Sequence, residues 1–108
     1  MRETFGEYIH KLRSESGLTL TKLAAALDID QSTLSKIENG KRTIPKEILP
    51  KLANAFELNM KELEREFYSQ QVAEIIYSYD EPQEVLKLAE EKAKYLRNKK
   101  HKQGKLKF

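Results

Sequence analysis

The stretch TLTKLAAALDIDQSTLSKIENG, residues 19–40, decides the fold of this 108-residue chain. Its first half carries apolar residues at the steps of three and four that mark one face of a helix, namely Leu20, Leu23, Ala24 and Leu27. Its second half repeats the step with Leu34 and Ile37. Because residues 28–30 separate the two halves, the sequence predicts two short helices joined by a tight turn.

The second of these predicted helices has a polar face that carries almost no charge. A surface helix is usually covered with Glu and Lys, but this face carries short hydroxyl and amide side chains and one lysine: Gln31, Ser32, Thr33, Ser35 and Lys36. Such side chains donate and accept hydrogen bonds at base edges, where Gln suits adenine and Lys suits guanine or phosphate. A helix of this kind, braced at an angle on a shorter one, fits a DNA major groove.

A larger set of residues resembles the phage repressor and Cro-type helix-turn-helix domain of the XRE family. Over residues 5–66 the matches stand in order at the family's spacing: Arg13, Gly17, Leu23, Ala24, residues 31–35 and 37–42, Leu52 and Ala53. An ordered set of this length is a far more specific signal than one short motif. The resemblance implies an all-α fold in which five helices form a repressor-like domain that binds double-stranded DNA.

The resemblance also implies individual roles. We expect base contacts from the polar face, at Gln31, Ser32, Ser35 and Lys36. We expect phosphate contacts from Thr33, Asn39, Lys41 and Arg42. The second predicted helix, over residues 31–39, corresponds to the recognition helix of the family. Beneath it Arg13 would pair with Glu38. Exposed ion pairs contribute only about 0–1 kcal/mol, so the value of this pair would lie in positioning the helix.

Two positions depart from the family pattern. Leu20 stands where the family often has a Gln that contacts a phosphate, so only the Leu20 backbone amide is expected to meet the DNA backbone. Asp28 stands where the turn usually has Gly. Because Asp tolerates a left-handed backbone better than most residues, we expect the turn to be retained.

The amino-acid composition limits the classes of function that the chain can have. Without cysteine the chain has no disulfide or thiolate metal site, and a reducing, cytoplasmic location is expected. No stretch resembles a signal peptide or a membrane span. His10 and His101 have no second ligand at metal spacing, and no serine has a recognisable base partner. We therefore expect no metal, no cofactor and no enzymatic activity.

The net charge of +3 is unevenly distributed. Six basic residues and no acid lie within residues 97–107, which leaves residues 1–96 with a net charge of −3. DNA affinity must then come from local placement of basic groups or from the C-terminal end. Lys41, Arg42 and Lys46 form a basic loop beside the recognition helix, consistent with clamping of the DNA backbone.

Cap signals place the helices of the first part of the chain. Thr4 with Glu7 and Asn59 with Glu62 have capping-box spacing. Thr19 is the expected cap of the first motif helix, the scanning helix, and Asp30 is the expected cap of the recognition helix. Gly17 is expected to end the helix before the motif, and Gly40 the recognition helix. The fourth helix either begins near Leu49 or is kinked at Pro50.

The chain continues beyond a minimal domain, which we expect to end at residue 66. Residues 67–79 and 83–97 predict a C-terminal helical hairpin whose apolar stripes include Val72, Ile75, Ile76, Tyr79, Leu86, Ala89, Ala93 and Leu96. We favour a dimer interface made by these eight residues; the alternative is that they pack on their own domain. Residues 98–108 are expected to be a basic, disordered tail.

The sequence thus predicts a homodimeric, sequence-specific transcription regulator without enzymatic activity, which represses by occluding an inverted-repeat operator. Its size and resemblance also suit regulators of restriction–modification genes. An antitoxin is the nearest alternative, with residues 67–108 binding a toxin partner. A further alternative is a helix-turn-helix protein-interaction module that no longer binds DNA.

Overall fold

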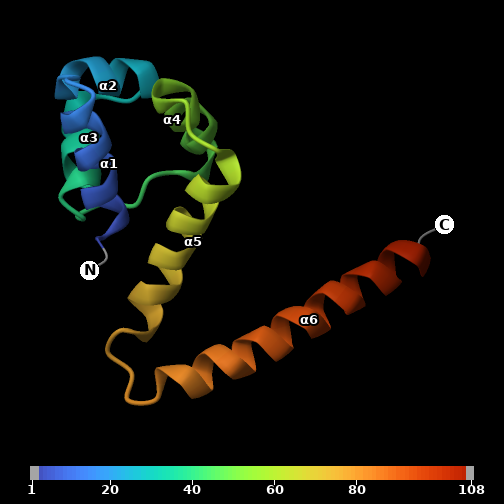
Figure 1. Ribbon diagram of the computed structural model, residues 1–108. Coiled ribbons are helices and arrows are strands. Elements are labelled where there is room, and N and C mark those ends of the chain that lie inside the picture. Colours follow the sequence, from blue (N-terminus) through green and yellow to red (C-terminus); the bar gives the residue numbers. More distant parts are fainter. Residues whose placement is uncertain (1–2, 107–108) are drawn as a thin grey trace. The chain divides into compact units, whose positions relative to one another are not determined.

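The computed structural model describes residues 3–106, with side chains as far as residue 100, and forms two compact units, Met1–Gln71 and Val72–Phe108. The elements are α1 (Phe5–Glu15), α2 (Leu20–Leu27), α3 (Gln31–Glu38), the 3-10 helix η1 (Lys46–Ile48), α4 (Leu49–Phe56), α5 (Met60–Ile76) and α6 (Pro82–Leu106) (Figure 1). The predicted all-α fold is confirmed.

The helices of the first unit begin at the predicted caps. Thr4 and Glu7 form a capping box, in which each side chain accepts a hydrogen bond from the other residue's backbone N–H, at 3.1 and 2.8 Å. The Thr19 hydroxyl and the Asp30 carboxylate each accept from the amide three residues on, at 3.1 and 2.7 Å. Asn59 caps α5 in the same way. These bonds satisfy amides that lack a partner within the helix.

The turn between α2 and α3 has the backbone conformation that the sequence predicts. Asp28 is left-handed, with φ 58° and ψ 43°, and ends α2 without a glycine. Gly17 and Gly40 take positive φ after α1 and α3, where a Cβ would be strained. Glu57 ends α4 with a φ of 53°, which nothing in the sequence pattern indicates.

The inward faces of the helices in the first unit supply most of the hydrophobic core. The buried apolar residues are Phe5, Ile9, Leu23, Ala24, Leu27, Leu34, Ile37, Ile44, Ile48, Leu49, Leu52, Ala53, Leu63 and Phe67. Leu20 belongs to the predicted α2 stripe but is only half-buried. Ile44 and Ile48 were not predicted, because neither the loop after α3 nor the single turn of η1 has a helical periodicity that would reveal buried residues. They anchor the basic loop that follows α3.

The region around Pro50 resolves the two starts considered for the fourth helix. A single turn of 3-10 helix, η1, runs directly into α4, which begins at Leu49. Pro50 therefore lies in the first turn of α4, where its missing N–H costs no intrahelical hydrogen bond. The start predicted near Leu49 is confirmed.

α3 lies at the surface of the first unit, in contact with α1 and α2. Figure 1 shows α1 and α3 side by side with α2 across one end, and α2 packs on both α3 and α4. Gly6 of α1 sets the closest approach to α3. A Cβ at Gly6 would lie 2.9 Å from the carbonyl oxygen of Glu38 and closer still to that of Ile37. Only glycine lets the two backbones meet at this spacing.

The boundary of the first unit lies after Gln71, later than the boundary predicted after residue 66. Phe67 is buried and packs edge-on against Phe5, with ring centroids 5.7 Å apart. The Gln70 side chain accepts a 2.9 Å hydrogen bond from the Phe5 backbone N–H. These contacts link residues more than sixty positions apart, so α5 closes the N-terminal unit before continuing beyond it.

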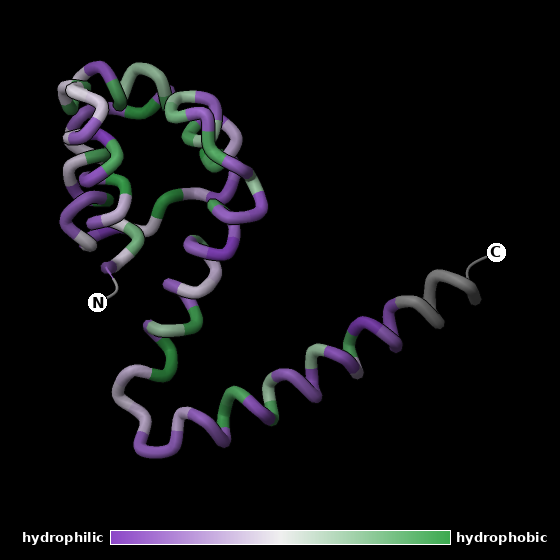
Figure 2. The backbone as a smooth tube through the Cα atoms, viewed as in Figure 1, coloured by the Kyte–Doolittle hydropathy of each residue, from purple (hydrophilic) through white to green (hydrophobic). Residues whose placement is uncertain are grey.

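The second unit contains the end of α5 and the whole of α6. The predicted break between two helices is present between Ile76 and Pro82. α6 then continues to Leu106, although a disordered tail was predicted from residue 98. That prediction is wrong as far as Leu106, because Lys and Arg are good helix formers and favour a helix C-terminus. Residues 107 and 108 lie outside the described part. Figure 2 shows hydrophobic positions recurring among hydrophilic ones along α6.

Within residues 3–106 no helix combines the length and the apolar character that crossing a membrane requires.

The contact at Gly6 makes a testable prediction about stability. Gly6→Ala should lower the free energy of unfolding by about 1–3 kcal/mol, because backbone carbonyls of α3 cannot move away from the added methyl group without shifting the helix. Urea unfolding followed by circular dichroism measures the change. The control is Lys11→Ala, an exposed position on α1 that should change stability by less than about 0.5 kcal/mol. Equal stability of both variants would show that α1 and α3 do not approach this closely.

Candidate nucleic-acid interface

A buried carboxylate joins the last turn of α3 to α1. Glu38 has a side chain only 5% exposed, and its Oε2 accepts a 2.7 Å hydrogen bond from Arg13 Nε. Its Oε1 accepts a second bond, of 3.1 Å, from Arg13 Nη2. The two-pronged contact uses the planar fork of the guanidinium, which fixes direction as well as distance. The predicted pair between Arg13 and Glu38 is present.

The same arginine also holds the loop between α1 and α2. Arg13 Nη1 donates a 3.1 Å hydrogen bond to the backbone carbonyl of Leu18. His10, one turn before Arg13 on α1, places Nδ1 2.9 Å from Glu38 Oε1. The His10 contribution was not predicted, although its spacing of three residues from Arg13 puts both on one face of the helix.

Burial changes the character of this ion pair. The sequence predicted an exposed pair, whereas Glu38 is enclosed between two helices, so the expectation of exposure was wrong. Burial by itself would raise the pKa of Glu38, but hydrogen bonds from Arg13 and His10 and the nearby positive charge outweigh it and hold the pKa below its ordinary value. Glu38 is therefore a carboxylate at neutral pH.

The polar face of α3 is left open by this packing. Leu34 and Ile37 are at most 2% exposed and fix the inner face of the helix. On the outer face, four predicted base-contacting residues surround a shallow hollow of about 450 Å³: Gln31, Ser32, Ser35 and Lys36. Leu20, from the first turn of α2, completes the lining. The structure thus brings these five residues together on one surface.

A hydrogen bond between the two motif helices crosses this surface. The Thr21 hydroxyl donates to Gln31 Oε1 at 2.7 Å. Thr21 is an exposed residue in the first turn of α2 and was not singled out in the sequence. No local pattern indicates the bond, because Thr21 and Gln31 lie on different helices and meet only when α2 and α3 have packed.

The residues predicted to contact phosphates lie at both ends of α3. The Thr33 hydroxyl and backbone N–H bond to Asp30, and these bonds lower the pKa of the Asp30 carboxyl. The Asn39 side-chain amide donates to the Ser35 carbonyl at 2.9 Å, which holds it against the last turn. Lys41, Arg42 and Lys46 are exposed after α3. Their contacts with phosphate, like that of the Leu20 amide, stay predictions.

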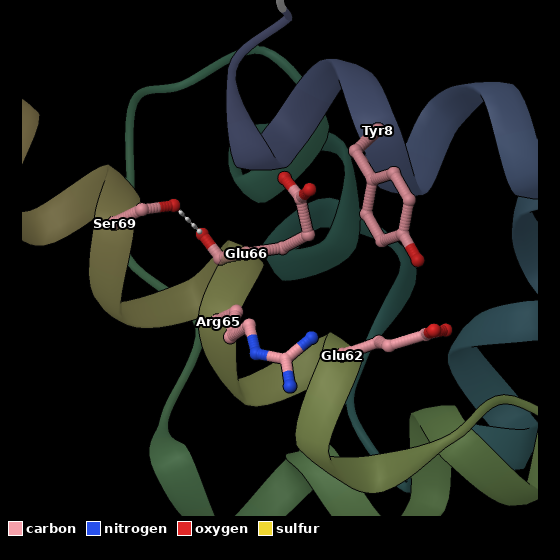
Figure 3. Close-up of a pocket in the computed structure, with 5 residues that line it drawn as sticks. All are labelled: Tyr8, Glu62, Arg65, Glu66 and Ser69. Atoms are coloured by element: carbon pink, nitrogen blue, oxygen red, sulfur yellow. Dashed lines mark hydrogen bonds between the residues drawn. The ribbon is translucent and has the colours of Figure 1, made fainter.

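A second hollow, of about 400 Å³, lies between α1 and α5 (Figure 3). Its lining residues are Tyr8, Glu62, Arg65, Glu66 and Ser69. Burial raises the pKa of Tyr8, and the carboxylates of Glu66, Glu62 and Glu3 raise it further. An acidic environment of this kind repels phosphate, so this hollow is not part of the candidate interface.

The geometry of α2, α3 and their turn agrees with comparisons against known proteins. A family model described as Helix-turn-helix matches residues 9–63, about half of the chain. The chain belongs to this helix-turn-helix family. The match runs from α1 into the first turn of α5 and so covers the brace, the open polar face and the basic loop. The predicted XRE-type regulator is confirmed at the level of the family.

Relatives support the same family. The HTH-type transcriptional repressor RghR of Bacillus subtilis (strain 168) is 42% identical over 57 residues, which is 52% of this chain and 42% of that protein. The control protein C.MunI of Mycoplasma sp is 37% identical over 60 residues, which is 55% of this chain and 81% of that protein. No solved structure matches the chain significantly.

The extent of these matches limits what they carry over. A second Bacillus subtilis protein, the uncharacterized HTH-type transcriptional regulator RghRB, is 48% identical over 42 residues, 39% of this chain and 30% of its own length. The chain thus matches less than half of either Bacillus subtilis relative. The comparisons identify a family of regulators.

The buried brace makes a prediction with a defined pH dependence. Glu38→Gln should destabilise the protein by about 1–3 kcal/mol at pH 7, because Arg13 and His10 lose the charge that they bind. The folded-state pKa of Glu38 is depressed, so its contribution is present above the unfolded pKa of about 4.3 and is lost as the pH falls through the folded value.

Urea unfolding of wild type and variant between pH 7 and pH 3 measures this effect. The difference in stability should shrink as the pH falls. Glu15→Gln, an exposed acid on α1, serves as the control and should show little difference at any pH. A constant difference between wild type and Glu38→Gln over this range would contradict the ionised, braced state of Glu38.

Proposed function

We propose that the protein is a sequence-specific regulator of transcription that binds double-stranded DNA through α3. One observation carries the proposal, namely the open surface formed by Gln31, Ser32, Ser35 and Lys36 on a helix whose inner face is buried. These side chains match the donors and acceptors of base edges, and a helix held on a second helix in this way fits a major groove.

In this proposal, DNA is attracted by a few basic residues that follow α3 and not by the net charge of the first unit. Residues 1–71 carry eleven basic and eleven acidic side chains, so the first unit has no net charge that would attract DNA. Lys41 and Arg42 follow the C-terminal end of α3 after Asn39 and Gly40, and Lys46 begins η1. The buried Ile44 anchors this loop to the core. We propose that these three cations contact phosphates beside the groove that α3 would enter.

A homodimer on an inverted repeat is the proposed assembly. The predicted interface residues include large apolar side chains that are exposed in the single chain, with Ile75 72% and Leu96 63% exposed. Val72, Tyr79 and Leu86 are exposed as well. Large apolar side chains that are exposed at helical spacing favour a role in an interaction surface. Two copies joined through the second unit would present two α3 helices to half-sites about one DNA turn apart.

Repression by occlusion is the proposed mode of regulation. A relative that matches 57 residues of this chain is named a transcriptional repressor, which supports this direction for the present chain. Control of restriction–modification genes rests on the sequence resemblance alone and stays a prediction. The antitoxin alternative would use the exposed apolar residues of the second unit for a toxin instead of a second copy, and copurification of a small toxin would distinguish it.

The proposal is tested by selecting DNA from a random pool with the full-length protein. The selected sequence is then compared with a scrambled sequence by fluorescence anisotropy at two salt concentrations. A common motif with inverted symmetry, bound much more tightly than the scrambled DNA, would support the proposal. Failure to enrich any motif would refute sequence-specific binding and favour the protein-interaction module.

Base contacts and phosphate contacts should respond differently to mutation. Gln31→Ala should weaken binding to the selected site by about 1–3 kcal/mol and leave binding to scrambled DNA nearly unchanged. Lys41→Ala should weaken both and reduce the slope of log K against log salt by about one. The control is Lys61→Ala on α5, which should change neither. Equal effects of Gln31→Ala on every DNA would contradict the assigned role.

The dimer makes a separate prediction. Ile75→Glu or Leu96→Glu should weaken self-association by at least about tenfold, because each would bury a charge in an apolar contact. Sedimentation velocity over a range of protein concentrations gives the dissociation constant. Lys94→Glu, an exposed charged position on α6, is the matched control and should have a much smaller effect. Unchanged association in both apolar variants would place the dimer contact elsewhere.

A further inference from the structure

One side of α6 carries a regular apolar stripe (Figure 2). Its members recur at steps of three, four and three, the spacing of a coiled-coil seam, and they are Leu86, Ala89, Ala93 and Leu96. Leu86 is 38% exposed and Leu96 is 63% exposed. No side chain of α6 as far as residue 100 is buried in the single chain. The stripe is therefore open to another helix.

The side-chain sizes along this stripe suit the same stripe on a second copy of α6. The small Ala89 and Ala93 occupy its middle, where they let two helix backbones approach closely, and a leucine lies at each end. Leucine would meet leucine and alanine would meet alanine whether the second helix ran in the same or in the opposite direction. Size thus indicates the partner, and another property must decide its direction.

Charge is distributed unevenly between the two halves of α6. Residues 82–91 hold three acidic residues and one basic residue, whereas residues 92–100 hold five basic residues and no acidic one. The acidic residues are Glu84, Glu90 and Glu91, and the basic residues of the second half are Lys92, Lys94, Arg97, Lys99 and Lys100. Because exposed charges are largely screened beyond about 10 Å at 0.1 M salt, the half that lies alongside decides the interaction. A parallel pair would align two basic halves, but an antiparallel pair places each basic half beside an acidic one.

Lys100 supports the same direction. It continues the spacing of the stripe, four residues after Leu96. In a parallel pair the two Lys100 side chains would meet across the seam, where like charges repel each other. In an antiparallel pair with Leu86 opposite Leu96, each Lys100 would lie beside the first turn of the other α6, which carries Glu84. The charges of α6 therefore favour the antiparallel arrangement.

We propose that two copies of the protein associate through antiparallel pairing of their α6 helices, with Leu86 of one copy opposite Leu96 of the other. This inference rests on the homodimer of the proposed function and adds its direction and register. The two-fold axis then passes between Ala89 and Ala93, so the contact is the same for both copies. The N-terminal ends of the two α6 helices lie at opposite ends of the pair, about 27 Å apart along its axis.

Disulfide cross-linking of the full-length protein tests the register. The chain has no cysteine of its own, so an introduced cysteine reports on one position. Leu86→Cys and Leu96→Cys are oxidised separately and as a mixture in which one variant carries a tag. The mixture should give a linked dimer of tagged and untagged chains, and neither variant should link to itself. Two copies of the same cysteine would lie about 15 Å apart along the axis, and a disulfide needs Cα atoms within about 7 Å. The control is Glu91→Cys, on the opposite side of α6, which should not link in any combination.

A second measurement leaves the apolar stripe intact. Gln83→Cys places a spin label at an exposed position near the start of α6, outside the stripe. Double electron–electron resonance then gives the distance between the two labels of a dimer. Antiparallel pairing separates them by about 24 Å along the axis, whereas a parallel pair would hold them at the same level. This distance decides the direction even if a cysteine within the stripe weakens association.

The contrary outcomes separate this inference from the proposed function. Linked dimers of Leu86→Cys alone, or labels at the same level of the pair, would show parallel helices and overturn the inference while the homodimer stands. A dimer in sedimentation without linkage in the mixture, and without the expected label distance, would place the contact outside α6 and overturn it as well. A protein that stays monomeric at every concentration would instead refute the proposed homodimer itself.

Discussion

The position of α3 depends on the buried carboxylate of Glu38. Removing a charge from water is costly unless the charge is fully paired, and here Arg13 contacts both carboxylate oxygens while His10 reaches one of them. The same guanidinium reaches the Leu18 carbonyl in the loop before α2. One arginine thus ties α1, the entry to α2 and the end of α3 together, and the absence of a side chain at Gly6 lets the two helices approach closely enough for this contact.

The two ends of α3 are held by different means. The brace fixes the C-terminal end, while the Asp30 cap and the bond between Thr21 and Gln31 act at the N-terminal end. Between them Leu34 and Ile37 bury the inner face. A helix held in this way keeps its outer face in one orientation, and less ordering remains to be done when a partner binds. This rigidity makes an eight-residue helix a suitable element for reading a surface.

The second unit differs from the first in how it uses apolar residues. In the first unit fourteen buried apolar residues form one cluster. In the second unit Ile75 and several tyrosines and leucines are exposed in the single chain. An amphipathic helix needs a surface to cover its apolar stripe, and the proposed second copy would supply one. The long α6 also carries basic residues near its end, so its two functions in a dimer on DNA would be association and local positive charge.

The sequence by itself determined the elements that depend on neighbouring residues. Thr4, Thr19, Asp30 and Asn59 cap their helices as predicted, because a cap is formed within one helical turn. Asp28 adopts the left-handed turn for an equally local reason. The polar and apolar faces of α3 follow from helical periodicity. The family resemblance added the pairing of Arg13 with Glu38, which no periodicity indicates.

Only the tertiary structure decided the contacts between residues far apart in the chain. It buried Glu38 and added His10 to its partners, it extended the first unit to Gln71 through Phe67 and Gln70, and it placed Thr21 against Gln31. Ile44 became a core residue in a loop without any pattern. Such contacts depend on the distance and angle at which helices pack, and those quantities are set by the whole core, whereas sequence periodicity fixes only the face that each helix buries.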